Sequence, residues 1–321
     1  MTKEKDDVLQ ADALAKAAKD LKTEISKIIV GQDDVVKLLL ISIFCDGHAL
    51  LVGVPGLAKT MLVQTLSKSL SLKSNRIQFT PDLMPSDILG AETMDKDRNL
   101  RFVQGPIFSN IILADEINRT PPKTQSALLE AMQEKSVTVG GTHYPLDRPF
   151  FVLATQNPIE QEGTYPLPEA QLDRFMFMIK LDYPDYDDEM EIVRRTTSGD
   201  LPEIKAILSK DEILEFQKLI RKVPVTDNVL EYAVSLVTKT RSGTDKSHEL
   251  ATNYLEWGAG PRASQFLVYA AKCHAILNGK YSPDIEDVKA VAHAVLSHRM
   301  VRNFKADAEG YSEERIIDEL L

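Results

Sequence analysis

The sequence has few of the features that mark secreted, membrane-spanning or disulfide-bonded proteins. Its 321 residues include two cysteines, Cys45 and Cys273, which are too few for a disulfide framework and are more simply explained as free buried thiols. No apolar run approaches the ~20 residues that cross a bilayer. The first residues, Met-Thr-Lys-Glu-Lys-Asp-Asp, lack the apolar core of a signal peptide. These absences predict a cytoplasmic protein without a membrane span.

Basic residues are in the minority, with 38 Lys and Arg against 48 Asp and Glu and a formal net charge of −10. A chain with this excess of acidic residues gains no affinity from counterion release on a phosphate backbone, so general nucleic-acid binding is disfavoured. A local basic pore remains compatible with this charge balance. The six histidines have no metal-ligand spacing. The remaining composition, 43% hydrophobic and 27% charged, is ordinary for a globular protein, and the length favours about two domains.

Residues 50–60 carry the most informative motif and read Leu-Leu-Val-Gly-Val-Pro-Gly-Leu-Ala-Lys-Thr. The apolar run 49–52 predicts a buried strand, and a helical pattern opens after Lys59. A glycine-bearing loop between a strand and a helix can wrap backbone N–H groups around phosphate oxygens, with the positive helix end directed at them. Lys59 would then reach the β- and γ-phosphates of ATP, and the Thr60 hydroxyl would bind Mg²⁺.

Ala58 departs from the general form of this loop, which has glycine before the Lys-Thr pair. Alanine fits there if its φ is negative. An ordinary Gly/Pro turn is the alternative, but later segments supply the other parts of a nucleotide site. Near the N-terminus, Val30 beside Gly31 could contact an adenine ring, and plain core packing explains them equally well. The residues expected to contact ATP or ADP are Val30, Gly31, Gln32, Gly53, Val54, Pro55, Gly56, Leu57, Ala58, Lys59, Thr60, Met61 and Asp115.

An apolar run, 111–114, leads directly into Asp115 and Glu116. This pattern predicts a buried parallel strand whose carboxyl end delivers carboxylates to a ligand crevice. Asp115 would hold Mg²⁺ through water, and Glu116 would orient the water that attacks the γ-phosphate. A strand that merely ends in solvated acids is the alternative, and it leaves the earlier Lys59–Thr60 pair unexplained.

Asn157 and Arg174 are two further candidate site residues, each at the end of a predicted element. Asn157 comes after a second apolar strand, 150–154, where its amide could bind the γ-phosphate and the attacking water; an Asx-type turn before proline is the alternative. Arg174 ends a short helix and could reach the nucleotide of a neighbouring chain. Its alternative is a surface pair with Asp173 or Glu169, worth at most about 1 kcal/mol.

Two segments of the first half interrupt the strand–helix pattern. Residues 80–106, punctuated by prolines and a glycine, predict a short helix and a hairpin insertion, with a disordered loop as the alternative that Leu100 and Phe102 argue against. Residues 136–146, with a Gly-Gly turn between short β-like runs, predict a second hairpin.

The composition changes after the acidic, proline-marked segment 182–189, and no convincing strand follows it. We therefore expect an α/β nucleotide-binding domain in 1–185 and a small all-helical domain in 186–321. Arg262 begins one of its helices, where a cation is electrostatically unfavourable unless an anion such as a γ-phosphate lies opposite. A plain helix-surface arginine is the alternative.

The order of these segments resembles that of an AAA+ ATPase, and over roughly residues 20–300 their amino-acid sequences resemble those of the MoxR family. The segments that carry the resemblance are Gly-Val-Pro-Gly-Leu-Ala-Lys-Thr, Ala-Asp-Glu-Ile-Asn-Arg, Ala-Thr-Gln-Asn-Pro and Leu-Pro-Glu-Ala-Gln-Leu-Asp-Arg-Phe. Ala58 is the family's own form. The resemblance implies a P-loop NTPase with a parallel sheet flanked by helices and a helical lid. It also implies residue roles, namely Walker A for Lys59 and Thr60, Walker B for Asp115 and Glu116, sensor 1 for Asn157, the arginine finger for Arg174 and sensor 2 for Arg262.

The resemblance further implies Mg²⁺-dependent hydrolysis of ATP to ADP and phosphate in a ring, which we expect to be a hexamer with both hairpins facing its pore. The family's members look like chaperones that pair with von Willebrand factor A domain proteins and remodel client proteins or insert cofactors or metals. Two alternatives stay open. A nucleotide-gated binding module would not need Glu116, Asn157 and Arg174 together. A chelatase-like or DNA-acting motor subunit would keep the chemistry, but the acidic balance weakens its DNA form.

Overall fold

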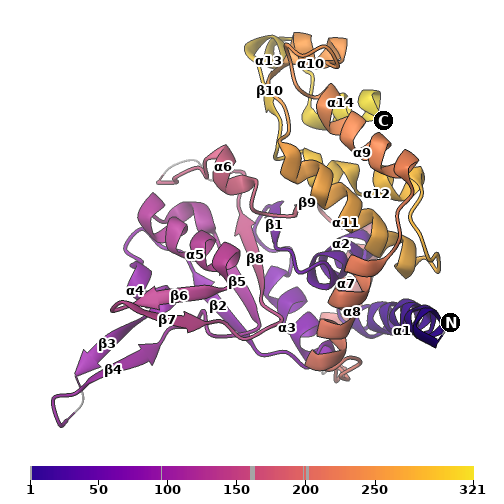
Figure 1. Cartoon of the computed structure of the whole chain (residues 1–321). Helices are drawn as coiled ribbons and strands as arrows, with labels where there is room; N and C mark the ends of the chain where they lie inside the picture. The colour runs from indigo at the N-terminus through magenta and orange to yellow at the C-terminus, as the bar shows by residue number, and fades with distance from the viewer. Residues whose placement is uncertain (1, 95, 160–162, 198, 200–201) are drawn as a thin grey trace.

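The computed structural model describes residues 2–94, 96–159, 163–197, 199 and 202–321 (Figure 1). Its α/β part is built on a five-stranded sheet of order β2-β5-β8-β1-β9, in which every neighbouring pair is parallel. The five strands are β1 (Ala49–Gly53), β2 (Ser74–Gln78), β5 (Ile111–Asp115), β8 (Phe151–Gln156) and β9 (Phe177–Leu181). The carboxyl ends of parallel strands share one edge, so the loop after β1 and the acidic end of β5 are separated only by β8.

The central strands β1, β5 and β8 are buried on both faces along most of their length, which is why they are nearly continuous apolar runs, whereas the edge strand β2 is polar at most positions. In β5, Ile111 and Leu113 join one core cluster while Ile112 and Ala114 join another, because side chains alternate between faces along a strand. The helices that flank the sheet or connect its strands are α1 (Thr2–Ile25), α2 (Asp33–Phe44), α3 (Lys59–Ser69), α5 (Pro122–Glu134), η1 (Ile117–Arg119) and α6 (Glu169–Leu172).

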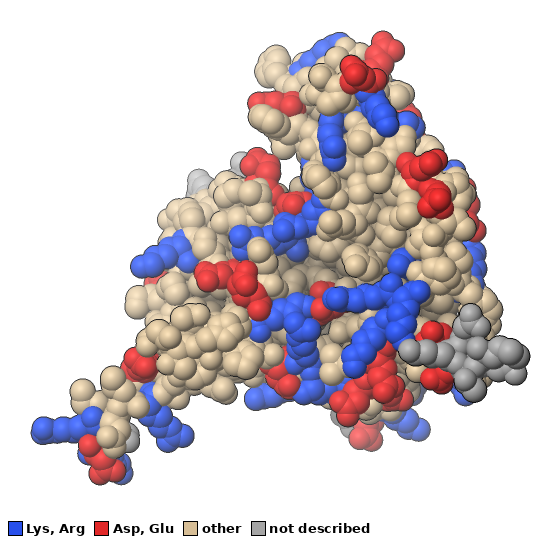
Figure 2. All heavy atoms as spheres, in the orientation of Figure 1, with Lys and Arg blue, Asp and Glu red and all other residues tan. Residues whose placement is uncertain are grey.

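The two predicted hairpins are present and project from the α/β part (Figure 1). The first follows α4 (Pro85–Leu89) and pairs β3 (Gly90–Met94) with β4 (Leu100–Gln104), and the second pairs β6 (Ser136–Val139) with β7 (Thr142–Pro145). Phe102 of β4 stacks on Tyr144 of β7 with their ring centroids 4.2 Å apart, so the hairpins touch. Figure 2 shows both signs of charge on the projecting β3–β4 hairpin and across the visible face.

The second part of the chain is helical, as predicted. Its helices are α7 (Tyr186–Thr197), α8 (Lys210–Lys222), α9 (Asp227–Lys239), α10 (Glu249–Tyr254), α11 (Pro261–Leu277), α12 (Ile285–Leu296), α13 (Phe304–Glu309) and α14 (Glu313–Leu320). The expectation of no strand was wrong at one place, where β10 (Leu255–Trp257) pairs antiparallel with β11 (Val301–Arg302). Segments this short carry no alternating pattern, and their pairing depends on a contact between distant parts of the chain.

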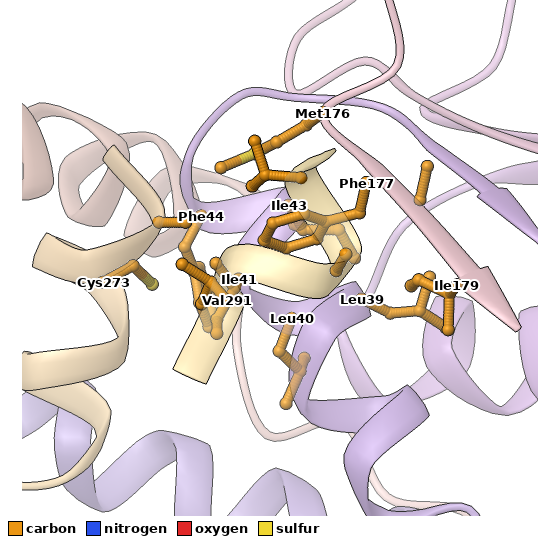
Figure 3. Packing of buried hydrophobic residues seen from close by; sticks show 14 of the residues in the cluster. Leu39, Leu40, Ile41, Ile43, Phe44, Met176, Phe177, Ile179, Cys273 and Val291 are labelled. Atoms are coloured by element: carbon orange, nitrogen blue, oxygen red, sulfur yellow. The ribbon is translucent and has the colours of Figure 1, made fainter. Parts of the chain in front are cut away.

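The helical part and the sheet share one hydrophobic core rather than meeting across a polar joint. Phe44 of α2 meets Phe216 of α8 edge to face, with ring centroids 6.1 Å apart. Met176, Phe177 and Cys273 lie in the same buried cluster (Figure 3). Both cysteines are free, and Cys45 is only partly buried. Among the described residues, no helix is long and apolar enough to cross a membrane.

Candidate nucleotide-binding site

The predicted phosphate-binding loop connects the end of β1 to the start of α3. Gly53 is required there because a Cβ on it would lie 2.7 Å from the Cβ of Leu181 on the neighbouring strand β9. Gly56, at the turn of the loop, has φ +90°, a backbone conformation that side chains disfavour. The loop therefore has glycine at two positions for two different reasons, close strand packing and a left-handed turn.

Ala58 has φ +52° and ψ 25°, so the expectation of a negative φ was wrong. A left-handed residue before a helix turns successive backbone N–H groups toward a common point, which is how the chain forms an anion-binding concavity. That geometry costs about 1–2 kcal/mol for a residue with a Cβ. Ala58 thus carries backbone strain at the place where the loop would face phosphate.

The N-terminus of α3 is left open to an anion. No side chain caps it, and its first turn contains no acidic residue. Lys59 is half-buried, and its Nζ donates to the Gly53 carbonyl oxygen at 2.7 Å. Burial lowers the pKa of the Lys59 ammonium, and the charges of Asp115 and Glu116 oppose that shift. The charges of the lysine in one motif and of the acids in the other therefore influence each other.

The two acids are held by polar partners from neighbouring strands. Asp115 Oδ1 accepts from Thr155 Oγ1 at 2.6 Å, while its Oδ2 accepts from Arg76 Nη2 at 2.6 Å and Nε at 3.1 Å. Glu116 Oε2 accepts from Gln78 Nε2 at 2.8 Å. Arg119 Nη1 lies 3.2 Å from the same Oε2.

Sequence reasoning missed Arg76, Gln78 and Thr155 in these roles. Their contacts follow from strand order, because β2 and β8 flank β5 on its two sides. The parallel register sets Gln78 opposite Asp115. The polar residues Arg76 and Gln78 in an otherwise buried sheet were the available signal, but nothing in the sequence states which strands are neighbours.

The residues at this edge suit a magnesium–nucleotide complex. Thr60 and Asp115 offer a hydroxyl and a carboxylate, hard oxygen ligands of the kind that Mg²⁺ takes together with substrate phosphates and water. The described residues contain no group of three or more His, Cys, Asp or Glu that could hold a metal by themselves. The Arg76 guanidinium at Asp115 Oδ2 shows that this oxygen already attracts a positive charge.

Asn157 is buried, 7% exposed, just past the carboxyl end of β8. Its Oδ1 accepts from the Ile159 backbone N–H at 3.1 Å, so the Asx-type turn considered from the sequence is present. Thr155, two residues earlier, is the side chain of this segment that contacts the acidic pair.

Arg174 and Arg262 bind different partners, and the partner of Arg262 is Asp173, the residue before Arg174. Arg174 Nη1 donates to the Leu129 carbonyl oxygen at 2.8 Å rather than forming the surface pair considered above. Asp173 Oδ2 instead accepts from Arg262 Nη1 at 3.0 Å. The anion opposite Arg262 is thus a carboxylate of the same chain.

Arg299 completes this cluster and was not identified from the sequence. It is 7% exposed, and its Nε donates to Asp173 Oδ1 at 2.8 Å. It also donates to the backbone oxygens of Asp173 at 3.0 Å and Met176 at 3.2 Å. Burial lowers the pKa of Arg299 to about 10, and Asp173 opposes that shift. Because Asp173 and Met176 lie more than 120 residues away in the chain, no local pattern could reveal these contacts.

A cavity of about 690 Å³ lies beside the loop and is large enough for a nucleoside. Of the residues expected to contact ATP, those on its wall are Val30, Gly31, Gln32, Pro55, Gly56 and Leu57. Met61 and Val54 instead pack against the main hydrophobic core. The other predicted site residues do not line it, and these are Gly53, Ala58, Lys59, Thr60, Asp115, Glu116, Asn157, Arg174 and Arg262.

The fold and this site match known families. Residues 48–177 match the ATPase family associated with various cellular activities (AAA), and residues 247–320 match the AAA lid domain. The class of protein is therefore an AAA+ ATPase, a nucleotide-binding α/β domain followed by a helical lid.

Similarity to individual proteins narrows the assignment from this class to one family. The protein named YeaC from Bacillus subtilis is 42% identical over 92% of this chain and 91% of its own length. Chaperone MoxR1 from Mycobacterium tuberculosis is also 42% identical, over 93% of this chain and 79% of its own. The crystal structure of a proposed ATPase from Cytophaga hutchinsonii, 45% identical, superposes with a TM-score of 0.93 over 100% of this chain and 98% of that one. The chain belongs to the MoxR family of AAA+ ATPases.

Proposed function

We propose that this chain binds Mg²⁺–ATP at the edge of its sheet and hydrolyses it to ADP and phosphate, using an α/β domain of residues 1–185 and a lid of residues 186–321. The observation that carries the proposal is the placement of the loop after β1, the uncapped N-terminus of α3 and the acidic end of β5 at one edge of the sheet, where the charges of Asp115 and Glu116 act on the pKa of Lys59. An uncapped N-terminus and a nearby ammonium favour a phosphate, and the carboxylates favour the cation that accompanies it.

Each residue of the site has a proposed role. The loop N–H groups and Lys59 bind the phosphates, and Thr60 and Asp115 hold Mg²⁺, which would neutralise charge on the transferring phosphoryl group. Glu116 orients and polarises the attacking water, with Asn157 as a second polar contact for that water or the γ-phosphate. Arg174 and Arg262 supply positive charge toward a triphosphate.

We further propose that the active form is a ring, with six subunits as the expected number, in which Arg174 serves the nucleotide of the adjacent subunit. Arg174 donates to the Leu129 carbonyl oxygen rather than to a group at the acidic end of β5, which is consistent with a role outside its own site. The projecting β3–β4 and β6–β7 hairpins would face the pore. A relative bears the name chaperone, which supports remodelling of a client protein.

The client and partner rest on family resemblance. We propose a client that is remodelled or loaded with a cofactor or metal, assisted by a von Willebrand factor A domain protein. The two free thiols, Cys45 and Cys273, are consistent with a reducing compartment such as the cytoplasm.

Mixing two inactive variants tests this arrangement. An arginine supplied by a neighbour is worth about 10³–10⁵ in rate, and a positioned carboxylate base about 10²–10⁴, so Arg174→Ala and Glu116→Gln alone should each turn over ATP very slowly. In a mixed ring, a subunit lacking Arg174 keeps Glu116 and receives the arginine of a Glu116→Gln neighbour. The mixture should therefore recover up to about a quarter of wild-type phosphate release, if subunits mix at random.

The matched control mixes Arg174→Ala with the double variant Glu116→Gln/Arg174→Ala, which has no arginine to donate and should recover nothing. If the first mixture is as inactive as its components while forming rings, Arg174 does not act across the interface. Wild-type protein that releases no phosphate from ATP would remove the proposed activity itself.

A further inference from the structure

We propose that Asp173 is a positioning residue for ATP hydrolysis, which acts by holding the Arg262 guanidinium in place beside the segment that carries Arg174. This inference rests on the proposed function, because it gives Asp173 a role only if Arg262 contributes to turnover. It adds a residue to the site that neither the motif pattern nor the lid assignment identifies.

One carboxylate binds two arginines, one with each of its oxygens. Asp173 Oδ1 accepts from Arg299 Nε at 2.8 Å, and Oδ2 accepts from Arg262 Nη1 at 3.0 Å. Charge-assisted hydrogen bonds of this kind are about twice as strong as neutral ones. Both arginines belong to the lid, whereas Asp173 belongs to the α/β part between α6 and β9.

The two arginine side chains differ in conformational freedom. The Arg299 side chain is 1% exposed and bonds several backbone oxygens, so it is fixed. The Arg262 side chain is 40% exposed, and its hydrogen-bond partner among the described residues is Asp173, so its head group can exchange one anion for another. Arg299 thus anchors Asp173, and Asp173 in turn orients Arg262.

Arg299 also contacts the helix that carries Arg262. The guanidinium of Arg299 lies 5.0 Å from the ring centroid of Phe266. Phe266 is one helical turn after Arg262 in α11, so both lie on the same helix face. Arg299 therefore fixes the face of α11 from which Arg262 projects as well as the carboxylate that it meets.

The backbone connects this cluster to Arg174. Arg174 follows Asp173 directly and is tied by Nη1 to the Leu129 carbonyl oxygen at 2.8 Å. A displacement of Asp173 relative to the lid would move the backbone that carries Arg174. Holding a long cationic side chain in one geometry before the reaction lowers the conformational entropy that it loses when it meets the phosphate. Asp173 would supply that preorganisation.

A double-mutant cycle tests the inference, with Asp173→Asn, Arg262→Ala and their combination measured for ATP turnover. If Asp173 acts through Arg262, Asp173→Asn should lower kcat about tenfold, leave KM for ATP within about twofold, and change kcat by less than about twofold when Arg262 is already alanine. Glu169→Gln, the same change of charge at an exposed position of the same segment, should leave kcat at the wild-type value.

Other results would overturn it. An equal fall in kcat on Asp173→Asn in both backgrounds would mean that Asp173 only supports Arg299 and the lid. Wild-type kcat for Asp173→Asn, or for Arg262→Ala, would also reject it. If Asp173→Asn fails to fold, Asp173→Glu keeps the charge that faces Arg299 and displaces the carboxylate, and it enters the same cycle with the same expected outcome. Absence of turnover in wild type would instead reject the proposed function, a distinguishable result.

Discussion

At the scale of single residues, Ala58 shows that the site holds a conformation its own side chain disfavours. Its φ of +52° is left-handed, and the next residue, Lys59, begins α3. Glu116, the proposed water-orienting residue, has φ +56°. Strained backbone of this kind persists where the surrounding structure determines it, and it is found most often at functional sites.

Replacing Ala58 by glycine should stabilise the folded protein. Removal of the left-handed strain gains about 1–2 kcal/mol, and the greater freedom of glycine in the unfolded chain costs about 0.4–1 kcal/mol. We expect a net gain of about 0.5–1 kcal/mol in the free energy of unfolding, measured by urea denaturation. Ala13→Gly, at an exposed position inside α1, should instead lose about 1 kcal/mol. Equal destabilisation by both changes would contradict the strain at Ala58.

The placement of residues within a motif could be predicted from the sequence, and contacts that depend on tertiary neighbours could not. Lys59, Thr60, Asp115 and Glu116 follow strand ends at diagnostic spacing, so the pattern alone brings them to one edge. Arg299 has no such pattern, since its partners Asp173, Phe175 and Met176 lie in a distant segment. The φ of Ala58 was missed because it is set by the loop's conformation rather than by residue preference.

At the scale of elements, most of the sheet was predictable because β1, β5, β8 and β9 are short, mainly apolar runs. The β10–β11 pair was not, because two short segments separated by more than 40 residues form it. The start of β1 also depends on a buried histidine. His48 Nδ1 accepts from the Val152 N–H at 3.0 Å and Nε2 donates to the Met132 carbonyl oxygen at 3.1 Å. One imidazole thereby connects β8 and α5 to the strand before the phosphate loop.

His48 should make the protein less stable in mild acid. Burial lowers the pKa of His48 from its ordinary 6.5 to about 4, with the Lys135 charge adding to the shift. The neutral ring is the native form, so its stabilising effect is complete above pH 6.5 and is lost as the pH falls toward 4. Between pH 7 and pH 5 this group should cost about 2 kcal/mol of the free energy of unfolding.

Urea denaturation of wild type and His48→Gln at the two pH values measures this effect, since glutamine can make similar hydrogen bonds without titrating. His298, also buried with a lowered pKa, contributes in the same direction in both proteins and cancels in the comparison. His143→Gln, at an exposed position, is the control and should keep the wild-type pH dependence. Equal pH dependence in His48→Gln and wild type would rule out this role.

At the scale of the whole molecule, the lid and the sheet are parts of one packed body. A continuous core runs from α2 and β9 into α8, α11 and α12, and the Asp173 cluster adds polar contacts at the same junction. Nucleotide-dependent movement of the lid would therefore have to break or shift defined contacts. A family assignment cannot supply this information, because it depends on the particular residues that meet across the junction.

The central claim is that the acidic end of β5 performs ATP hydrolysis at the phosphate loop after β1. The most direct test measures ATP binding and phosphate release by wild type, Glu116→Gln and the exposed-site control Glu130→Gln on α5. We predict that Glu116→Gln binds ATP with near wild-type affinity and releases phosphate about 10²–10⁴ times more slowly, while Glu130→Gln matches wild type. Wild-type turnover by Glu116→Gln, or no ATP binding by wild type, would contradict the claim.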